Sequence, residues 1–537
     1  MQQLLHKLGP SIAVHGQRGV ASLAMFRKAQ QYAGSAIAEE RERIAIVDES
    51  GPHTYAQLVG DAGRVRRCLG AAEGGNLGGA SVAMLIPNSY EYAAVQWGIW
   101  AAGGSVVPLS PMHPQRELEY FIANSEARTV ICHPTLLPSI DAAVRELHAV
   151  RIIRSDTCMS AETDTMGLDD VDVDETQSAL FIYTSGTTGR PKGVVHTHAS
   201  IGAQVSALCQ AWQWTTSDRL LHVLPLHHIH GIVVALCAAL WSGATTEMLP
   251  RFDKDRVWDR LIDGPQDISV LMGVPTMYAR LLAALDEMPA ERQMAARAAV
   301  GRLRLTVSGS AALPASVFAR WQDATGQAML ERYGMSEIGM ALSNDAAQPA
   351  TRQPGSVGMP LPGVHVRLMD ADGVDVTCTP GSSGMIQVKG PNVFREYYGM
   401  PEKTAAEFTP DGWFITGDVA TRSADGLYRI MGRQSVDIIK SGGFKLSALE
   451  IERELLEHPS VADVAVVGVP SEDWGEAVAA AAVLSPGAEP LELGPLTSWC
   501  YQRMARYKAP KSLLVVDALP RNLMGKLDKS AVKAMFS

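Results

Sequence analysis

Short apolar segments alternate with helical stretches through roughly the first 330 residues of this chain. SVAMLIP at 81–87, RTVIC at 128–132 and ALFIYT at 179–184 are the short segments, while SYEYAAVQWGIWAAGG at 89–104 has helical periodicity. This alternation is typical of parallel sheets covered by helices, so we expect an α/β fold. A chain of 537 residues with 47% hydrophobic content can bury several cores, and we expect at least two domains.

The pattern changes after about residue 360. Turn-rich strand segments, GVHVRLMD at 363–370 and GMIQVKG at 384–390, predict a small β subdomain attached to the large one. From about residue 434 a compact α/β pattern begins, and Ser447 with Glu450 three positions later forms a capping box at its first helix. We therefore expect the last hundred residues or so to form a separate small domain.

The overall charge argues against nucleic acid as the main partner. The chain has 47 Lys and Arg against 57 Asp and Glu, a formal net charge of −10, whereas phosphate backbones are bound through a surplus of cations. Its seven cysteines show no ligand spacing, which favours a reducing compartment over a disulfide framework or a zinc site. The apolar stretch GIVVALCAALW at 231–241 is too short to span a bilayer and predicts a buried helix, so we expect no transmembrane segment.

The N-terminus is free of acidic residues. Residues 1–38 contain Lys7, Arg18, Arg27 and Lys28 but no Asp or Glu, which is typical of a transit peptide; an ordinary frayed terminus is the alternative. We expect a targeting segment over residues 1–24 and a location in the mitochondrial matrix, with the cytoplasm as the alternative.

A loop rich in glycine and hydroxyl groups, YTSGTTGRPKG at 183–193, directly follows the apolar run ALFI. Backbone N–H groups and hydroxyls in such a loop can surround phosphate oxygens, and Lys192 would add a positive charge. The Walker pattern is absent because Lys192 stands between Pro191 and Gly193. The loop by itself predicts either a phosphate site or an ordinary turn.

Five ordered motifs give this loop a context. TSGTTGRPKG, ERYGMSE at 331–337, GWFITGD at 412–418, the pair Gly432-Arg433 and PRNLMGK at 520–526 resemble the adenylate-forming acyl-CoA synthetase superfamily, over nearly the whole chain from about residue 25. Further segments resemble its malonyl-CoA synthetase branch; they are LPLHHIHG, LMGVPTMYARLL, VSGSAALP, ERYGMSEIGM, GPNVFREYY and IIKSGG.

The resemblance implies a two-step reaction with ATP, Mg²⁺ and coenzyme A. A carboxylate attacks the α-phosphate of ATP to give an acyl-adenylate and pyrophosphate, and the thiol of coenzyme A then displaces AMP. It also implies an AMP-binding domain at 25–432, a hinge at 433–437 and a C-terminal domain at 438–537. We expect a monomeric enzyme of fatty acid metabolism.

The same resemblance implies the nucleotide site. The loop would hold the β- and γ-phosphates, Tyr333 would stack on adenine, and Ser336 would meet the α-phosphate. Glu337 would bind Mg²⁺, a hard cation that prefers oxygen ligands. Asp418 and Arg433 would bind the ribose hydroxyls. The full set of expected ATP or AMP contacts is Thr184, Ser185, Gly186, Thr187, Thr188, Gly189, Lys192, Ser310, Ala311, Glu331, Tyr333, Gly334, Met335, Ser336, Asp418, Arg433 and Lys526.

Lys526 is the residue expected to carry the first step, together with Lys192 and Glu337. A carboxylate attacking a polyanion is opposed by charge, and an ammonium group between them lowers that barrier. The family moves its small domain between the two steps, and the hinge residue is one of Ser435, Val436 and Asp437. In the second arrangement, coenzyme A would contact Lys440, Ser441, Gly442 and Gly443.

Arg332 points to the acid substrate. Most relatives have a small residue at this position beside the acyl pocket, and a buried arginine there is costly unless it meets an anion. Arg280 and Ser310 match positions at the same pocket end, and together the three predict binding of a second carboxylate, as in malonate or methylmalonate. The alternative is that Arg280 is a helix-surface residue and Arg332 pairs with an internal acid such as Glu331.

Two other functions remain open from the sequence. A synthetase for a neutral short-chain, medium-chain or aryl acid would share the fold, but Arg332 and Arg280 weigh against it. A catalytically silent binding protein would be expected to have lost one of Lys192, Glu337 and Lys526. The histidines 227, 228 and 230 are expected to be gate or packing residues rather than metal ligands, because no acidic or cysteine partner is nearby in the sequence.

Overall fold

The fold is described from a computed structural model. It describes residues 24–73, 76–145, 147, 149–160, 168, 171, 173–184, 190–264, 266–442, 444–521 and 527–536. Several predicted features lie outside this part of the chain: the segment before residue 24, and Ser185, Gly186, Thr187, Thr188, Gly189, Gly443 and Lys526.

One sheet of the large domain has seven strands in the order β18-β8-β7-β4-β3-β5-β6. The five from β7 to β6 run parallel, and β8 and β18 are antiparallel additions at one edge. The strands are β3 (Ser81–Leu85), β4 (Ser105–Pro108), β5 (Thr129–Cys132), β6 (Arg151–Arg154), β7 (Ser178–Thr184), β8 (Lys192–Thr197) and β18 (Glu396–Tyr397). Three of these were predicted as apolar segments, and burial on both faces explains their continuous hydrophobicity.

The second sheet has more strands and combines a parallel part with an antiparallel part. Its order is β16-β17-β19-β20-β15-β14-β13-β12-β11-β9-β10-β1-β2. The strands are β1 (Ile44–Asp48), β2 (Gly51–Thr54), β9 (Arg219–His222), β10 (Thr245–Met248), β11 (Val270–Gly273), β12 (Leu305–Ser308), β13 (Leu330–Met335), β14 (Gly339–Ser343), β15 (Ser356–Pro360), β16 (His365–Met369), β17 (Ser383–Lys389), β19 (Phe414–Arg422) and β20 (Tyr428–Arg433). The part from β1 to β13 is parallel, and from β13 to β16 the pairing is antiparallel. The predicted β subdomain is therefore hydrogen-bonded to the large sheet through β14 and β15.

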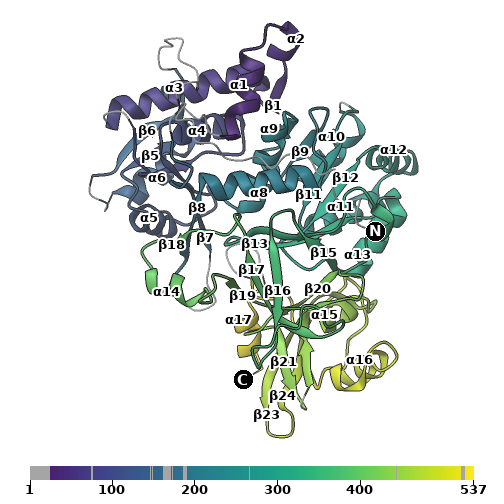
Figure 1. Cartoon of the computed structure of the whole chain (residues 1–537). Helices are drawn as coiled ribbons and strands as arrows, with labels where there is room; N and C mark the ends of the chain where they lie inside the picture. Colours follow the sequence, from purple (N-terminus) through teal and green to yellow (C-terminus); the bar gives the residue numbers. More distant parts are fainter. Residues whose placement is uncertain are drawn as a thin grey trace, which may run out of the picture.

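Helices lie between and outside the two sheets (Figure 1). Helix α8 (His198–Ala211) contacts β7 and β8 of one sheet and β14 of the other, so it is part of the central layer. The predicted buried helix is a π-helix, His230–Cys237, that continues into α9 (Ala238–Ser242). The others are α1 (Arg27–Ala33), α2 (Ala38–Arg41), α3 (Tyr55–Glu73), α4 (Tyr90–Ala101), α5 (Gln115–Asn124), α6 (Leu137–Val144), α7 (Ser155–Met159), α10 (Lys254–Ile262), α11 (Pro275–Glu287), α12 (Ala290–Gly301), α13 (Ala315–Thr325) and α14 (Pro401–Ala406). None of the described helices has the length and apolar character needed to cross a bilayer.

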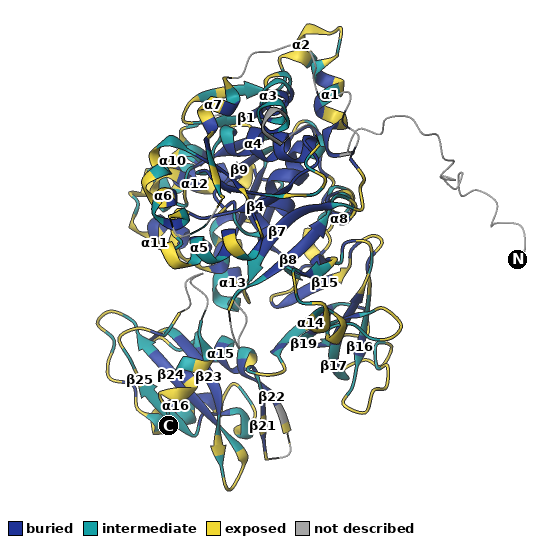
Figure 2. Cartoon of the chain, turned by 90° about the vertical axis from the view of Figure 1, so that its left-hand side faces the viewer, coloured by how far each residue is buried: buried dark blue, intermediate teal, exposed yellow. Residues whose placement is uncertain are grey.

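The last hundred residues form a second body with its own core (Figure 2). Strands β21 (Ile438–Ser441), β22 (Phe444–Ser447), β23 (Val461–Ser471), β24 (Gly475–Leu484) and β25 (Ser512–Val515) form its sheet, and its helices are α15 (Ala448–Leu455), α16 (Leu493–Cys500) and α17 (Lys529–Ala534). Ser447 Oγ accepts from the N–H of Glu450, which confirms the predicted start of α15. The linker falls between the end of β20 at Arg433 and the start of β21 at Ile438.

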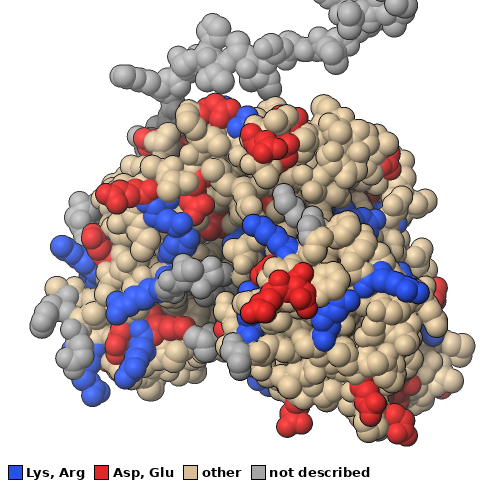
Figure 3. Space-filling model, turned by 90° about the horizontal axis from the view of Figure 1, so that it is seen from below, with Lys and Arg blue, Asp and Glu red and all other residues tan. Residues whose placement is uncertain are grey.

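Acidic and basic side chains are interspersed over the lower face of the molecule (Figure 3). The fields of interspersed opposite charges largely cancel at a distance, and salt screens what remains. Binding of a polyanion on this face therefore depends on a local group of cations.

The α3–α4 crossing gives a test of the packing. A Cβ at Gly98 of α4 would lie 2.3 Å from Val65 Cβ of α3, whereas a Cβ at Gly60 of α3 would meet nothing within 4 Å. We expect Gly98→Ala to lower stability by about 1–3 kcal/mol through overpacking. Gly60→Ala should leave it unchanged or raise it, because glycine is a poor helix former. Thermal and urea denaturation of both variants measure this, and equal midpoints would show that the helices are not in such close contact.

Candidate active site

Asp418 contacts the two other residues that were predicted to bind the nucleoside, Tyr333 and Arg433. Its Oδ2 accepts from the hydroxyl of Tyr333 at 2.6 Å, and its Oδ1 is 3.0 Å from Nε of Arg433. Strand geometry explains the second contact, because Asp418 of β19 and Arg433 of β20 are register partners. Tyr333 lies in β13, which is separated from β20 by β14 and β15 in the sheet order. The structure thus places an aromatic ring, a carboxylate and a guanidinium in one group.

The turn between β13 and β14 carries Ser336 and Glu337. The backbone O of Ser336 is 2.6 Å from Nε2 of His196, and the backbone O of Glu337 accepts from the N–H of Phe394 at 2.7 Å. His196 lies in β8 and Phe394 just before β18, so the seven-stranded sheet holds the main chain of this turn of the other sheet. Ser336 itself is half-buried.

Glu337 and Lys192 lie on either side of one tyrosine ring. The hydroxyl of Tyr397 donates to Oε1 of Glu337 at 2.8 Å, and Nζ of Lys192 lies 4.1 Å from the centre of the same ring. Burial raises the pKa of Glu337 and lowers the pKa of Lys192, since a low dielectric disfavours both charges. Each group would be more stable with a charged ligand beside it.

Glu337 is the carboxylate available for a metal at this site. The described residues contain no group of three or more His, Cys, Asp or Glu side chains that could hold a metal ion by themselves. Mg²⁺ takes one or two protein carboxylates and completes its shell with water and phosphate oxygens. One buried carboxylate, that of Glu337, therefore fits a cation that arrives with a nucleotide.

The base of the glycine loop is fixed by the β7–β8 pair. Thr184 and Lys192 are antiparallel register partners at its two ends. On the loop's exit, the backbone O of Pro191 accepts from the hydroxyl of Tyr120 at 2.7 Å, and the guanidinium of Arg190 lies over the same ring. The strand pair directs Thr184 and Lys192 to the same end of the sheet.

Arg332, which directly precedes Tyr333 on β13, lies under the exposed Ser310. Its Nη2 donates to Oγ of Ser310 at 3.3 Å, and Nδ1 of His230 is also 3.3 Å from that oxygen. Ser310 has a positive φ of 67°, an uncommon conformation for serine that turns the chain sharply after β12. Gly309 leaves the space for the arginine, because a Cβ there would lie 2.4 Å from the guanidinium carbon.

The Arg332 guanidinium is a buried cation without an ion-pair partner. The residue is 4% exposed, and among the described residues no carboxylate oxygen lies within 4.0 Å of its nitrogens. Its Nε is buried and has no hydrogen-bond partner in the described part of the chain. Burial lowers the pKa of Arg332 to about 9, which still leaves the group protonated at neutral pH. The burial and the charge of Arg332 hold the pKa of His230 well below its usual range, so the histidine is neutral there.

The alternative pairing of Arg332 with Glu331 is wrong. Neighbouring side chains on a strand point to opposite faces, and Oε1 of Glu331 instead accepts from the N–H of Gly355 at 2.6 Å. Arg429 and Arg453 are the cations whose charge acts on Glu331, while burial raises its pKa to about 7. Glu331 was also predicted among the nucleotide contacts, and its side chain lies at this Gly355 position.

Arg280 is exposed on α11, as the helix-surface alternative expected for it. The structure therefore joins Ser310 to Arg332 but gives Arg280 no contact with either of them in the described residues. Ala311 is exposed beside Ser310, and Gly334 and Met335 are half-buried next to Tyr333. The rings of His227 and His228 pack against each other with centres 4.0 Å apart.

The predicted coenzyme A residues lie in the β21–β22 hairpin of the small domain. Lys440 is exposed and its N–H donates to Glu476, while Ser441 is buried. Gly442 has a φ of +56° and its N–H donates to the backbone O of Trp474. In this arrangement the hairpin is at the lower end of the small domain (Figure 2).

Several functional contacts were not predicted from the sequence. Tyr397 stands 60 positions after Glu337, and His196 stands 140 positions before Ser336. His230 was predicted as a gate or packing residue, without its contact to Ser310. The LPLHHIHG and GPNVFREYY segments contain His230 and Tyr397, but nothing in their spacing indicates which partner each one meets.

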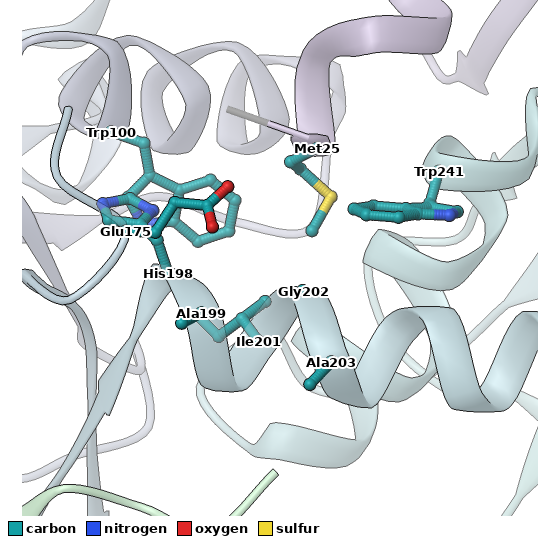
Figure 4. Close-up of a pocket in the computed structure, with 9 residues that line it drawn as sticks. All are labelled: Met25, Trp100, Glu175, His198, Ala199, Ile201, Gly202, Ala203 and Trp241. Carbon is teal, nitrogen blue, oxygen red and sulfur yellow. The ribbon is translucent and has the colours of Figure 1, made fainter. Parts of the chain in front are cut away.

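A separate cavity of about 170 Å³ lies between α8 and the helices that pack beside it (Figure 4). It contains none of the predicted site residues. Its lining is Met25, Trp100, Glu175, His198, Ala199, Ile201, Gly202, Ala203 and Trp241.

Comparison with known proteins gives consistent matches over nearly the whole chain. Residues 34–398 match the AMP-binding enzyme family and residues 450–526 match the AMP-binding enzyme C-terminal domain. The mitochondrial malonate–CoA ligase ACSF3 of Homo sapiens is 42% identical over 524 residues, covering 92% of this chain and 90% of the relative.

Two solved structures are also similar. ATP-bound MatB from Rhodopseudomonas palustris has a TM-score of 0.84 at 35% identity, covering 96% of this chain and 99% of MatB. A malonyl-CoA ligase in a ternary product complex with methylmalonyl-CoA and AMP has a TM-score of 0.65 at 37% identity, covering 92% and 99%. With the fold and the grouped motif residues, these matches lead to one conclusion: the chain belongs to the AMP-binding enzyme family.

Proposed function

We propose that this protein joins malonate, or methylmalonate, to coenzyme A at the expense of ATP, through an acyl-adenylate and with release of AMP and pyrophosphate. The observation that carries the choice of acid is the unpaired guanidinium of Arg332, buried beneath Ser310. The 42% identity with a malonate–CoA ligase over most of the chain supports the same substrate.

A buried charge without a partner destabilises the folded state by several kcal/mol, so its retention calls for a compensating ligand. A dicarboxylate supplies one: one carboxylate reacts at the nucleotide while the other pairs with Arg332 and accepts a hydrogen bond from Ser310. Guanidinium and carboxylate groups can form two parallel hydrogen bonds, which adds geometric selectivity to the charge pairing. Neutral His230 completes the surroundings without adding repulsion to the cation.

A neutral acid would leave this guanidinium desolvated and unpaired, which argues against the short-chain, medium-chain and aryl alternatives. The silent-protein alternative is also weakened, since Lys192 and Glu337 share one cluster around Tyr397. Such a cluster of opposite charges suits phosphates that carry a bound cation.

The nucleotide fits the group around Asp418. Asp418 and Arg433 offer an acceptor and a donor to the ribose hydroxyls, and Tyr333 offers a ring face to adenine. Ser336 would donate to the α-phosphate, and Lys192 would pair with the outer phosphates. Glu337 is the residue that would hold Mg²⁺, which would neutralise phosphate charge during the first step.

In the first step a malonate oxygen attacks the α-phosphorus, the bond to the β-phosphate oxygen breaks, and pyrophosphate leaves. Lys526 offsets the repulsion between the two anions. In the second step the sulfur of coenzyme A attacks the acyl carbon, the acyl–phosphate bond breaks, AMP leaves and the thiol proton is released.

The two steps use different arrangements of the small domain about the hinge at 433–437. The higher TM-score with ATP-bound MatB than with the product complex, at nearly equal identity, supports assignment of the present arrangement to the ATP-binding step. The hairpin that carries Lys440 would approach the site only after the small domain rotates.

The acid-free start of the chain and the mitochondrial location in the relative's name support a mitochondrial enzyme. We expect residues 1–24 fused to a fluorescent reporter to direct it into mitochondria, because cationic, acid-poor segments are drawn to the import machinery. Removal of the same residues should leave activity unchanged. A reporter that stays in the cytosol would contradict this location.

The substrate is tested with pyrophosphate release over a panel of mono- and dicarboxylates, with and without coenzyme A. We expect malonate to be preferred over butyrate in wild type. In Arg332→Gly and Arg332→Met, kcat/KM for malonate should fall by about 30-fold or more, since truncating a buried charge pair costs roughly 2–5 kcal/mol. The ratio of butyrate to malonate activity should rise, because the penalty on an apolar tail is removed.

Arg320→Met is the matched control, since Arg320 pairs with Asp286 on the surface of the same domain. It should keep the wild-type ratio. An unchanged ratio in folded Arg332 variants would remove the argument for a dicarboxylate and leave a general acyl-CoA synthetase.

Lys526 is tested by separating the two steps. Lys526→Ala should abolish malonate-dependent ATP–pyrophosphate exchange but spare thioester formation from acyl-adenylate that is made beforehand. The physical reason is that its ammonium group serves only the approach of one anion to another. Lys533→Ala, which removes an exposed lysine of α17, is the control. Equal loss of both steps in folded protein would show that Lys526 does not act in adenylation alone.

A further inference from the structure

A buried lysine holds two carboxylates together at the linker between the domains. Lys529 is the first residue of α17, and its side chain is 9% exposed. Its Nζ is 3.1 Å from Oδ1 of Asp437, also contacts Oε1 of Glu452, and donates to the backbone O of Val466 at 2.8 Å. Three elements of the small domain and the linker thus meet at one ammonium group.

Asp437 connects this lysine to the large domain. Its Oδ2 accepts from the N–H of Arg433 at 2.9 Å, and its own N–H donates to the backbone O of Arg433 at 2.8 Å. On the other side, its backbone O accepts from the N–H of Ala448 at 2.7 Å, at the start of α15. The side chain of Asp437 therefore closes the linker turn with one oxygen and pairs with Lys529 through the other.

The contacts continue to the nucleotide group. Arg433 ends β20, and its guanidinium pairs with Asp418, which in turn accepts from Tyr333. A continuous series of polar contacts thus runs from the predicted adenosine contacts through the linker turn to α17. A change in the turn would alter the backbone of Arg433 directly.

Charge makes Lys529 the critical member of this cluster. Asp437 and Glu452 are both buried, and Lys529 is the cation that pairs with both of them. Burial raises the pKa of Glu452 to about 7, while the charge of Lys529 acts to lower it. Without the lysine, two acids would face each other at low dielectric, and the turn would lose its tie to α17.

We propose that Lys529 is a positioning residue for adenylation: its ion pair with Asp437 holds the linker turn, and with it the two domains, in the arrangement that serves the ATP-binding step. This inference rests on the proposed function, because it assumes that the two steps use different domain arrangements. Asp437 is bonded to the main chain of Arg433 on one side and to Lys529 on the other, so a rotation within 433–437 would act on the turn that this pair holds.

The test compares variants that break the pair with a control on the same helix. Lys529→Met removes the charge while keeping most of the volume, Asp437→Asn removes the partner charge, and Lys529→Arg keeps a cation. Lys533→Met is the matched control. Lys533 lies one turn after Lys529 on α17, and the salt bridge described for it is with Glu476 at the surface. Each variant is assayed for malonate-dependent ATP–pyrophosphate exchange and for thioester formation from acyl-adenylate made beforehand, and its melting temperature is recorded.

We expect exchange to fall about tenfold or more in Lys529→Met and Asp437→Asn, a typical size for coupling between two sites. Thioester formation should change less than about threefold, so the ratio of the two rates shifts. Lys529→Arg should recover most of the exchange, and Lys533→Met should match wild type in both steps.

Equal losses in both steps, or an unchanged ratio in either folded variant, would overturn the role of Lys529 and leave it a structural residue of the small domain. If Lys529→Met does not fold, Asp437→Asn decides the matter by the same ratio. Absence of malonate-dependent exchange in wild type would instead contradict the proposed function, so the two failures are distinguishable.

Discussion

The hydrogen-bonded ion pair of Asp418 with Arg433 is the interaction on which the arrangement of this protein depends. It joins adjacent strands of the large sheet, and through Tyr333 it reaches the strand that carries the rest of the motif. Arg433 is also the last residue before the linker, where Asp437 binds its backbone. Asp418 therefore connects the predicted nucleotide contacts, through Arg433, to the linker that leads into the small domain.

The specificity that we propose would depend on a different feature, a buried charge that no described residue pairs with. The fold makes room for the guanidinium of Arg332 with Gly309 and covers it with Ser310, but the described part of the chain supplies no carboxylate to it. Leaving a buried cation unpaired costs stability, and a ligand that pairs with it recovers that free energy on binding. The same charge that weakens the free protein can thus select the acid, since only an anionic tail recovers the cost.

Arg332 and Tyr333 lie on the same strand, β13. Along β13, Arg332 contacts Ser310 while Tyr333 reaches toward Asp418, so under the proposed function successive residues would serve the two halves of the acyl-adenylate. Alternation of side chains along a strand makes this division possible in two positions. It also separates Arg332 from Glu331, whose carboxylate would otherwise have cancelled the charge.

The sequence by itself determined the α/β class and the order of the motifs, because hydrophobic periodicity and short motifs are local properties of the chain. The resemblance of those motifs to a family then singled out Tyr333, Asp418 and Arg433 for the nucleotide and Arg332 for the acid. Tertiary structure alone decided their partners: that Tyr397 meets Glu337, that His230 meets Ser310, that Glu331 turns away from Arg332, and that Lys529 pairs with Asp437. These contacts join residues distant in sequence, or depend on which face of a strand a side chain takes. The local sequence pattern does not say which distant residues come into contact. The packing of the two sheets and of the small domain determines these contacts.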